Sequence, residues 1–241
     1  MHKYLNIGSI EVPTYGVMVL FGIVVVNIIA GHIVKKNKLD LNRYVLIELI
    51  GGIGAIAGAK TLAVLEKILT CSNDVIIWEL FHKSGYSYLG GLFGFLLFLY
   101  IYYIFTGINI RDYAERMTFL LPLLHVFWKI GCFFGGCCRG ILYSGAGRLP
   151  IQLIEALTAL VICIFILVQQ KLQWFQCSIA LYLVLYGSSR FVLEFFRHHS
   201  ENQIFSVAHV LSLFCTVIGF CIWNVELVKR CRNDRAWPEN I

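Results

Sequence analysis

The stretch His125–Gly140 (HVFWKIGCFFGGCCRG) gathers the side chains best suited to chemistry. It ends an apolar run and holds an imidazole, two cations, three thiols and four glycines within sixteen positions. Ionisable groups at membrane depth are costly and usually face an internal cavity or a partner. Here His125 could accept a proton, Lys129 and Arg139 could hold an anion, and the thiols could act as nucleophiles. We therefore treat this stretch as the centre of a candidate site.

The composition places these groups in a membrane protein. Of the 241 residues, 59% are hydrophobic and only 14% are charged, whereas soluble domains carry roughly 25% charged residues. The net charge of +6 does not indicate nucleic-acid binding, because the basic residues lie in short loops between apolar runs. The nine cysteines are an odd number without paired CxxC motifs, which argues against a complete disulfide framework or a zinc ribbon.

Seven apolar segments each approach the roughly 20 residues that cross a bilayer as a helix. The predicted spans are 12–34, 44–65, 86–106, 117–134, 151–168, 175–196 and 204–225. The first is too long for the core of a secretion signal, and no small-residue cleavage site follows it. The sequence thus predicts an all-α integral membrane protein of seven helices. We expect one polytopic domain over residues 1–241, with short loops and a basic cytoplasmic tail at 226–241.

The basic residues in alternate loops predict the orientation. One side holds eleven of them and the other side six. The eleven are Lys35, Lys36, Lys38, Arg43, Arg111, Arg116, Lys171, Lys229, Arg230, Arg232 and Arg235; the six are Lys3, Lys67, Lys83, Arg139, Arg148 and Arg197. Because the richer side is usually cytoplasmic, we expect the N-terminus outside and the C-terminus inside. The cysteine end of His125–Gly140 then reaches the outer face.

Three cations, Lys60, Lys129 and Arg190, lie inside predicted spans. With Arg139, Arg148 and Arg197 near the outer ends, they outnumber the acids available to pair with them there. The missing counter-charge could be a phospholipid phosphate, which arginine binds through two parallel hydrogen bonds. The alternative is that these side chains form buried ion pairs that only position helices.

An ordered set of motifs resembles the prolipoprotein diacylglyceryl transferase family, whose members are seven-span enzymes of the bacterial inner membrane. The motifs are Tyr15-Gly16 with Met18, Gly58-Ala59-Lys60, Gly90-Gly91-Leu92, Lys129-Ile130-Gly131-Cys132 through Gly140, Pro150 with Gln152 and Glu155, Tyr186-Gly187, and Arg190-Phe191 with Glu194 and Arg197. The resemblance implies transfer of a diacylglyceryl group from phosphatidylglycerol to the cysteine thiol of a lipoprotein signal segment. It implies an inner-membrane location and no cofactor.

The residues and the resemblance together give a set of candidate site residues. The catalytic candidates are His125 as base, Lys129 at the position of an essential family arginine, and Arg190 and Glu194, which match an Arg and a Glu of the sixth span. The candidates for substrate binding are Tyr15, Lys60, Gly90, Gly91, Arg139, Gly140, Glu155 and Arg197. Both glutamates are expected mainly to anchor the cations. Cys132, Cys137 and Cys138 are candidate reactive thiols, and no metal site is predicted from their spacing.

The chain also departs from the best-known members of that family. Leu89 stands where they have a histidine, Cys132 and Cys137 where they have Asn and Glu, and Lys60 and Lys129 where they have arginines. The loop between Gly140 and Pro150 is short, so any outer head domain is reduced or absent. Two alternatives therefore stay open: a non-catalytic phospholipid-binding or transport protein on the same fold, and a membrane thiol redox protein.

Overall fold

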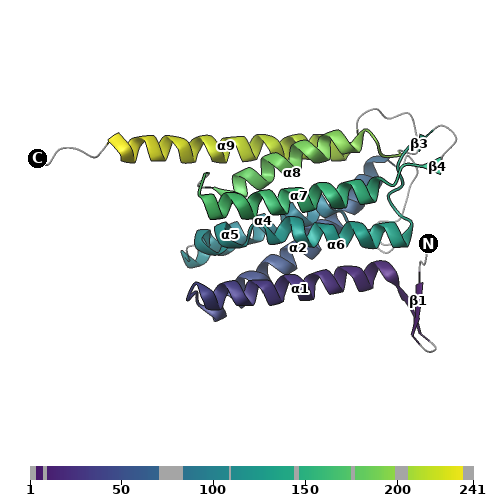
Figure 1. Ribbon diagram of the computed structural model, residues 1–241, viewed down its shortest axis with the longest axis horizontal. Helices are drawn as coiled ribbons and strands as arrows, with labels where there is room; N and C mark the ends of the chain where they lie inside the picture. The colour runs from purple at the N-terminus through teal and green to yellow at the C-terminus, as the bar shows by residue number, and fades with distance from the viewer. Residues whose placement is uncertain are drawn as a thin grey trace, which may run out of the picture. The chain divides into compact units, whose positions relative to one another are not determined.

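The computed structural model describes residues 4–7, 10–70, 84–108, 110–143, 147–174, 177–198 and 206–235. Helices make up most of this part of the chain (Figure 1). They are α1 (Thr14–Lys36), α2 (Leu41–Thr70), α4 (Tyr88–Thr106), α5 (Arg111–Met117), α6 (Leu120–Gly135), α7 (Ile151–Leu172), α8 (Ser178–Glu194) and α9 (Val207–Arg235). Two antiparallel hairpins accompany them, β1 (Tyr4–Ile7) with β2 (Ile10–Pro13) and β3 (Leu142–Tyr143) with β4 (Gly147–Arg148).

Each of the seven predicted apolar segments overlaps one of these helices, which confirms a helical membrane protein. Within the described residues, five helices are long and apolar enough to cross a membrane: α1, α2, α4, α7 and α9. Only 17% to 44% of their most apolar windows is buried inside the protein. The remaining apolar surface faces outward, as expected where lipid replaces water. The helices α6 and α8, with 16 and 17 residues, are shorter.

The structure adds features that the apolar pattern did not predict. The two short hairpins β1–β2 and β3–β4 accompany the helices of this all-α fold. The short helix α5 precedes α6, where a connecting loop was expected. The helix α9 continues to Arg235 and so includes most of the predicted tail, of which residues 236–241 lie outside the described part.

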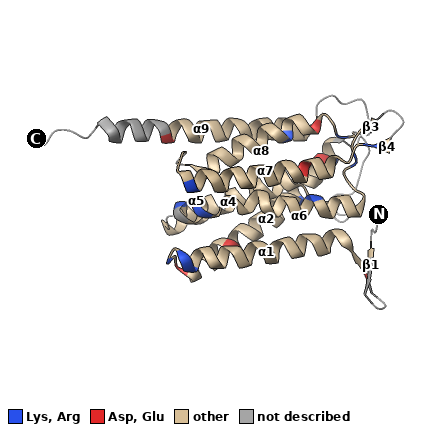
Figure 2. Ribbon diagram, in the orientation of Figure 1, with Lys and Arg blue, Asp and Glu red and all other residues tan. Residues whose placement is uncertain are grey.

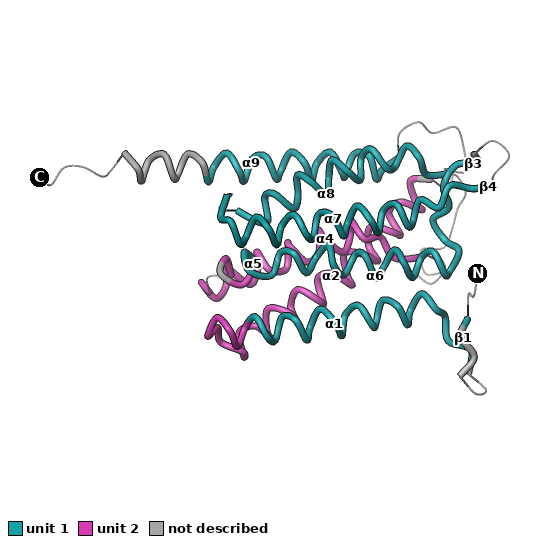
Figure 3. The backbone as a smooth tube through the Cα atoms, viewed as in Figure 1, with its two compact units in different colours: residues 1–33, 114–241 teal, residues 34–113 magenta. Residues whose placement is uncertain are grey.

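The chain folds into two compact units, residues 34–113 and residues 1–33 with 114–241 (Figure 3). In the smaller unit, α2 packs against α4 through glycines. A Cβ on Gly58 would collide with the carbonyl oxygen of Gly90, and a Cβ on Gly94 with that of Gly54. Close backbone approach of this kind is the usual packing of helices in lipid, where small residues replace hydrophobic driving force.

In the larger unit, helices α6, α7, α8 and α9 pack on one another in chain order. Ile151, Ile166 and Tyr182 are fully buried in its core. Two hydrogen bonds to Glu115 join α5, α7 and α8 at one end of the unit. Gln170 Nε2 donates to the Glu115 carbonyl oxygen at 2.5 Å, and the Ser178 backbone N–H donates to the Glu115 carboxylate at 2.6 Å. The hairpins lie at the other end of this unit (Figure 1).

Candidate functional site

The buried faces of α6 and α8 carry polar side chains where a soluble bundle would have apolar ones. On α6, the residues Pro122, His125, Lys129 and Cys132 are all buried, and their spacing of three and four places them along one face. On α8, Tyr182, Tyr186, Arg190 and Glu194 are buried at a strict spacing of four. Both polar faces turn inward, so the helix period brings the predicted residues into the core of the larger unit.

Two carboxylates and three cations form a continuous network between α6, α7 and the end of α8. Lys129 Nζ lies 2.5 Å from Glu155 Oε2. The guanidinium of Arg190 contacts Glu155 through Nη1 and Glu194 through Nη2, at 2.6 Å in the second case. Arg197 Nη1 lies 3.5 Å from Glu194. Figure 2 shows the acidic residues of α7 and α8 toward the end of the unit that holds β3 and β4.

This network retains one positive charge more than it has carboxylates, because Lys129, Arg190 and Arg197 share Glu155 and Glu194. The acids hold the cations in place, as the sequence predicted. Ser206, just before α9, also donates to Glu194 Oε1 at 3.2 Å. These five side chains therefore form a fixed group with a net charge of +1, which one bound anion would neutralise.

His125 lies in the wall of a small cavity beside this network. Glu155, Tyr186 and Arg190 also line the cavity, and the His125 and Tyr186 rings meet edge to face with centroids 5.3 Å apart. An imidazole that lines a cavity can accept a proton from a group bound there. The structure thus brings together all four residues predicted to be catalytic: His125, Lys129, Arg190 and Glu194.

The segment that follows α6 is fixed by backbone pairing near Arg197. Gly140 forms an antiparallel bridge with Arg197, and the Ile141 N–H donates to the Phe196 carbonyl oxygen at 3.1 Å. A Cβ on Gly140 would meet the Leu149 backbone, so the close approach requires glycine. Arg139 itself is exposed, and its Nε donates to the Gly136 carbonyl oxygen at 3.1 Å. Its role in substrate binding stays a prediction.

Tyr15, in the first turn of α1, packs on α6. Its ring meets Trp128 edge to face with centroids 5.9 Å apart. A Cβ on Gly131 would come within 3.2 Å of the Tyr15 carbonyl oxygen. Gly131 therefore allows α1 to approach α6. As a result, Tyr15 lies against the turn of α6 that follows Lys129.

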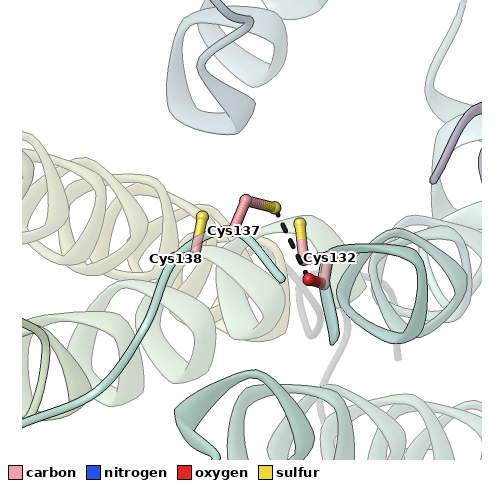
Figure 4. Close-up of side chains that lie close together, drawn as sticks. All are labelled: Cys132, Cys137 and Cys138. Atoms are coloured by element: carbon pink, nitrogen blue, oxygen red, sulfur yellow. Dashed lines mark hydrogen bonds between the residues drawn. The ribbon is translucent and has the colours of Figure 1, made fainter. Parts of the chain in front are cut away.

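The three cysteines of the central stretch lie together (Figure 4). Their Sγ atoms are all within 4.8 Å of one another, and Cys137 Sγ contacts the Cys132 carbonyl oxygen at 3.5 Å. Hydrogen bonds from the Cys132 and Cys137 thiols, helped by the charges of Arg197 and Lys129, hold the pKa of the Cys138 thiol well below its usual value. Cys138 is thus the thiol of this cluster that most readily forms a thiolate.

The remaining predicted residues, Lys60, Gly90 and Gly91, belong to the smaller unit. Lys60 Nζ donates to the Ser84 carbonyl oxygen at 2.7 Å and lies 4.8 Å from the centroid of the Tyr86 ring. Gly90 packs against Gly58 and Leu62 of α2. The structure accounts for Gly90 by helix packing, while the predicted contacts of Lys60 and Gly91 with substrate stay predictions.

Three polar residues of the site were not named as site residues from the sequence. Gln152 donates to the Cys137 carbonyl oxygen at 2.5 Å, Tyr186 lines the cavity and Ser206 bonds Glu194. Gln152 and Tyr186 each lie one helical turn from a predicted charged residue, and that spacing is a usable signal. Ser206 has no such signal, since its partner is distant in the sequence.

Comparison with known proteins identifies a family. A family model for prolipoprotein diacylglyceryl transferase matches residues 2–225. Three relatives carry the name phosphatidylglycerol–prolipoprotein diacylglyceryl transferase. The protein of Campylobacter hominis is 28% identical over 98% of this chain and 94% of its own length. That of Helicobacter pylori is 27% identical over 98% and 94%, and that of Clostridium tetani 22% identical over 92% and 96%.

These matches cover nearly the whole length of both proteins in each comparison, so they extend well beyond an isolated motif. They confirm the resemblance inferred from the ordered motifs between Tyr15 and Arg197, and they favour neither a thiol redox protein nor a non-catalytic lipid-binding protein. The chain belongs to the prolipoprotein diacylglyceryl transferase family.

Proposed function

We propose that this protein is an enzyme that moves a diacylglyceryl group from phosphatidylglycerol to the cysteine thiol of a prolipoprotein. Family membership and the names of the relatives give the reaction class. The observation that carries the proposal in this chain is the buried network in which Lys129, Arg190 and Arg197 exceed their two carboxylates by one charge. The phosphate of the donor lipid supplies the missing negative charge.

In the reaction, a carbon–sulfur bond forms at the glyceryl carbon and the carbon–oxygen bond to the phosphate breaks. The electron pair of that bond leaves with glycerol phosphate, so negative charge develops on the phosphate oxygens. Cations fixed by buried carboxylates stabilise such charge without having to reorganise during the step. We assign this role to Lys129 and Arg190, with Arg197 at the outer edge of the network.

The acceptor thiol must lose its proton, and we assign His125 as the group that takes it. The imidazole is buried on the same face of α6 as Lys129, one helical turn away, and lines the cavity with Glu155, Tyr186 and Arg190. A positioned histidine is the most common general base in enzymes. Glu155 and Glu194 position the cations and do not transfer protons in this scheme.

We further propose that α6 and α8 also cross the bilayer, which gives seven spans with the N-terminus outside. Both helices are short, yet each carries the buried polar face of the site, which needs protein on every side. The basic Arg116 and Lys171 lie at the end of the larger unit where α5 meets α7, and the positive-inside rule makes that end cytoplasmic. The cysteines then face the outer side of the bacterial inner membrane.

The direct test uses the purified full-length protein in vesicles of labelled phosphatidylglycerol with a peptide that contains a lipobox cysteine. We expect the lipid to be consumed, glycerol phosphate to be released, and the peptide mass to rise by one diacylglyceryl group. A peptide with serine in place of the cysteine is the acceptor control, and phosphatidylethanolamine vesicles are the donor control. No consumption of phosphatidylglycerol with any thiol acceptor would overturn the proposal.

A further inference from the structure

The three thiols of Cys132, Cys137 and Cys138 form a preorganised cluster rather than three separate packing residues. All three Sγ atoms lie within 4.8 Å of one another (Figure 4). Cys132 is buried, Cys138 is partly exposed and Cys137 is exposed. The cluster therefore has an inner wall and an open side, which is a geometry that admits a small ion from solution.

The backbone between these cysteines is bent so that their side chains converge. Gly136 ends α6 in the left-handed conformation with φ of 69°, and the Cys137 N–H donates to the Cys132 carbonyl oxygen at 3.2 Å. Cys138 also has a positive φ of 55°, which is uncommon for a residue with a side chain and often marks a functional constraint. Two left-handed residues within three positions turn the chain back toward Cys132.

Contacts from two other segments hold this bend in place. Gln152 on α7 donates to the Cys137 carbonyl oxygen at 2.5 Å. After Cys138, the chain pairs with the segment that follows α8, where the His198 N–H donates to the Arg139 carbonyl oxygen at 3.0 Å. The positions of the thiols are thus fixed by α6, α7 and the segment after α8, as expected for ligands of a bound ion.

The donor set indicates the class of ion. Sulfur ligands select soft metals such as Zn²⁺ and Cu⁺, whereas Mg²⁺ and Ca²⁺ require oxygen ligands. Three thiolates around one zinc at about 2.3 Å lie about 3.8 Å apart, so small side-chain rotations would close the observed cluster onto an ion.

We propose that Cys132, Cys137 and Cys138 bind one soft metal cation, Zn²⁺ or Cu⁺, through their three thiolates. The bound ion would tie the end of α6 to the segment that carries Gly140 to its pairing with Arg197. It would therefore stiffen the outer edge of the cationic network. The proposal concerns ion binding alone and does not depend on the transferase reaction.

The test measures metal binding by the full-length protein, reduced and freed of metal under argon. One arm titrates Zn²⁺ and the other Cu⁺, each in competition with a chromogenic chelator, and metal content is measured independently by mass spectrometry. We expect one equivalent bound in at least one arm, and that arm identifies the ion. C132S, C137S and C138S should each weaken binding by roughly 100-fold or more, because changes outside the ligand shell already cost about 10- to 100-fold.

The matched control is C221S, which removes an exposed free cysteine of α9 and should bind metal as the unmodified protein does. Thermal unfolding of each metal-free variant separates loss of metal binding from loss of fold. Because Cys137 is exposed, C137S is the variant that should disturb the fold least. In the Co²⁺ form, sulfur-to-cobalt absorption in the near ultraviolet should be present and should weaken in each of the three variants. Absence of binding in both arms, or equal binding by C137S and C221S, would overturn the proposal.

Discussion

Arg190 on α8 and Glu155 on α7 form an ion pair in which the side chains are only 8% and 1% exposed. Glu155 also accepts the Lys129 ammonium, so one carboxylate neutralises cations from two helices. This relationship joins α6, α7 and α8 through charge as well as packing. Removing the Glu155 carboxylate would therefore take a counter-charge from two buried cations, Lys129 and Arg190.

Replacing Glu155 with glutamine should therefore destabilise the protein. Breaking a buried pair by removing one partner typically costs about 3–5 kcal/mol, and here Lys129 loses its carboxylate and Arg190 loses one of its two. Thermal unfolding of E155Q in detergent measures the effect. The control is E11Q, at an exposed glutamate of β2, which should stay within about 0.5 kcal/mol of the unmodified protein. Equal stability of E155Q and E11Q would contradict the network described here.

Arg190 should not be replaceable by lysine. Its two terminal nitrogens contact two different carboxylates, Glu155 and Glu194, and a lysine ammonium cannot reproduce that planar fork. Loss of one charged hydrogen bond costs about 1.5–3 kcal/mol, which corresponds to a fall of roughly 10- to 100-fold in kcat/KM. Transfer assays on R190K, with K171R in the last turn of α7 as the control, measure it. Full activity of R190K would mean that the fork is not used.

His125 should act on the rate more than on lipid binding. If it accepts the thiol proton, H125Q should lower kcat by about 10²- to 10⁴-fold, because general-base catalysis contributes that much. The KM for phosphatidylglycerol should change little, since the cations that hold the phosphate are intact. The control is H32Q, at an exposed histidine of α1. A raised KM with unchanged kcat would assign His125 to binding and not to proton transfer.

Cys138 should remain reactive at lower pH than an ordinary thiol. Hydrogen bonds from Cys132 and Cys137 and the charges of Arg197 and Lys129 lower its pKa, so the thiolate persists as the pH falls below about 8.5, the usual thiol value. Iodoacetamide labelling of metal-free protein at several pH values, read by peptide mass spectrometry, should show this persistence.

The variant C132A tests the cause of that shift, because it removes the largest contribution. Its Cys138 labelling should move to higher pH, toward the curve of a free thiol in solution. The same curve in C132A and in unmodified protein would show that Cys132 has no part in lowering the Cys138 pKa.

The sequence predicted the helices well because a bilayer leaves the backbone few choices. An apolar segment in lipid must satisfy its own hydrogen bonds, so the predicted span 151–168 lies within α7 (Ile151–Leu172). The hairpin β1–β2 was missed because its strands have four residues each, and so short a pairing depends on register rather than on composition. The extension of α9 was missed because apolar content ends before the helix does.

The members of the site were predictable from residue type, but their pairing was not. Lys129, Glu155 and Arg190 stand out as charges within apolar segments. Which cation meets which carboxylate depends on the rotation of α6 and α8 against α7, and no local pattern fixes that rotation. The convergence of Cys132 with Cys138 likewise depends on two left-handed residues, Gly136 and Cys138. Glycine suggests the first of these, but nothing in the sequence signals the second.

The glycines of α2 provide a last test, because two positions of one helix differ in their surroundings. A Cβ on Gly58 would collide with the Gly90 carbonyl oxygen, whereas a Cβ on Gly52 meets nothing within 4 Å. Forcing atoms into a packed contact costs about 1–3 kcal/mol, so G58A should lower the thermal stability and G52A should not. Because Gly58 contacts α4 directly, the loss should deepen in G58V, while G52V stays near the unmodified protein. Equal behaviour of the two positions would show that α2 and α4 do not approach through this glycine face.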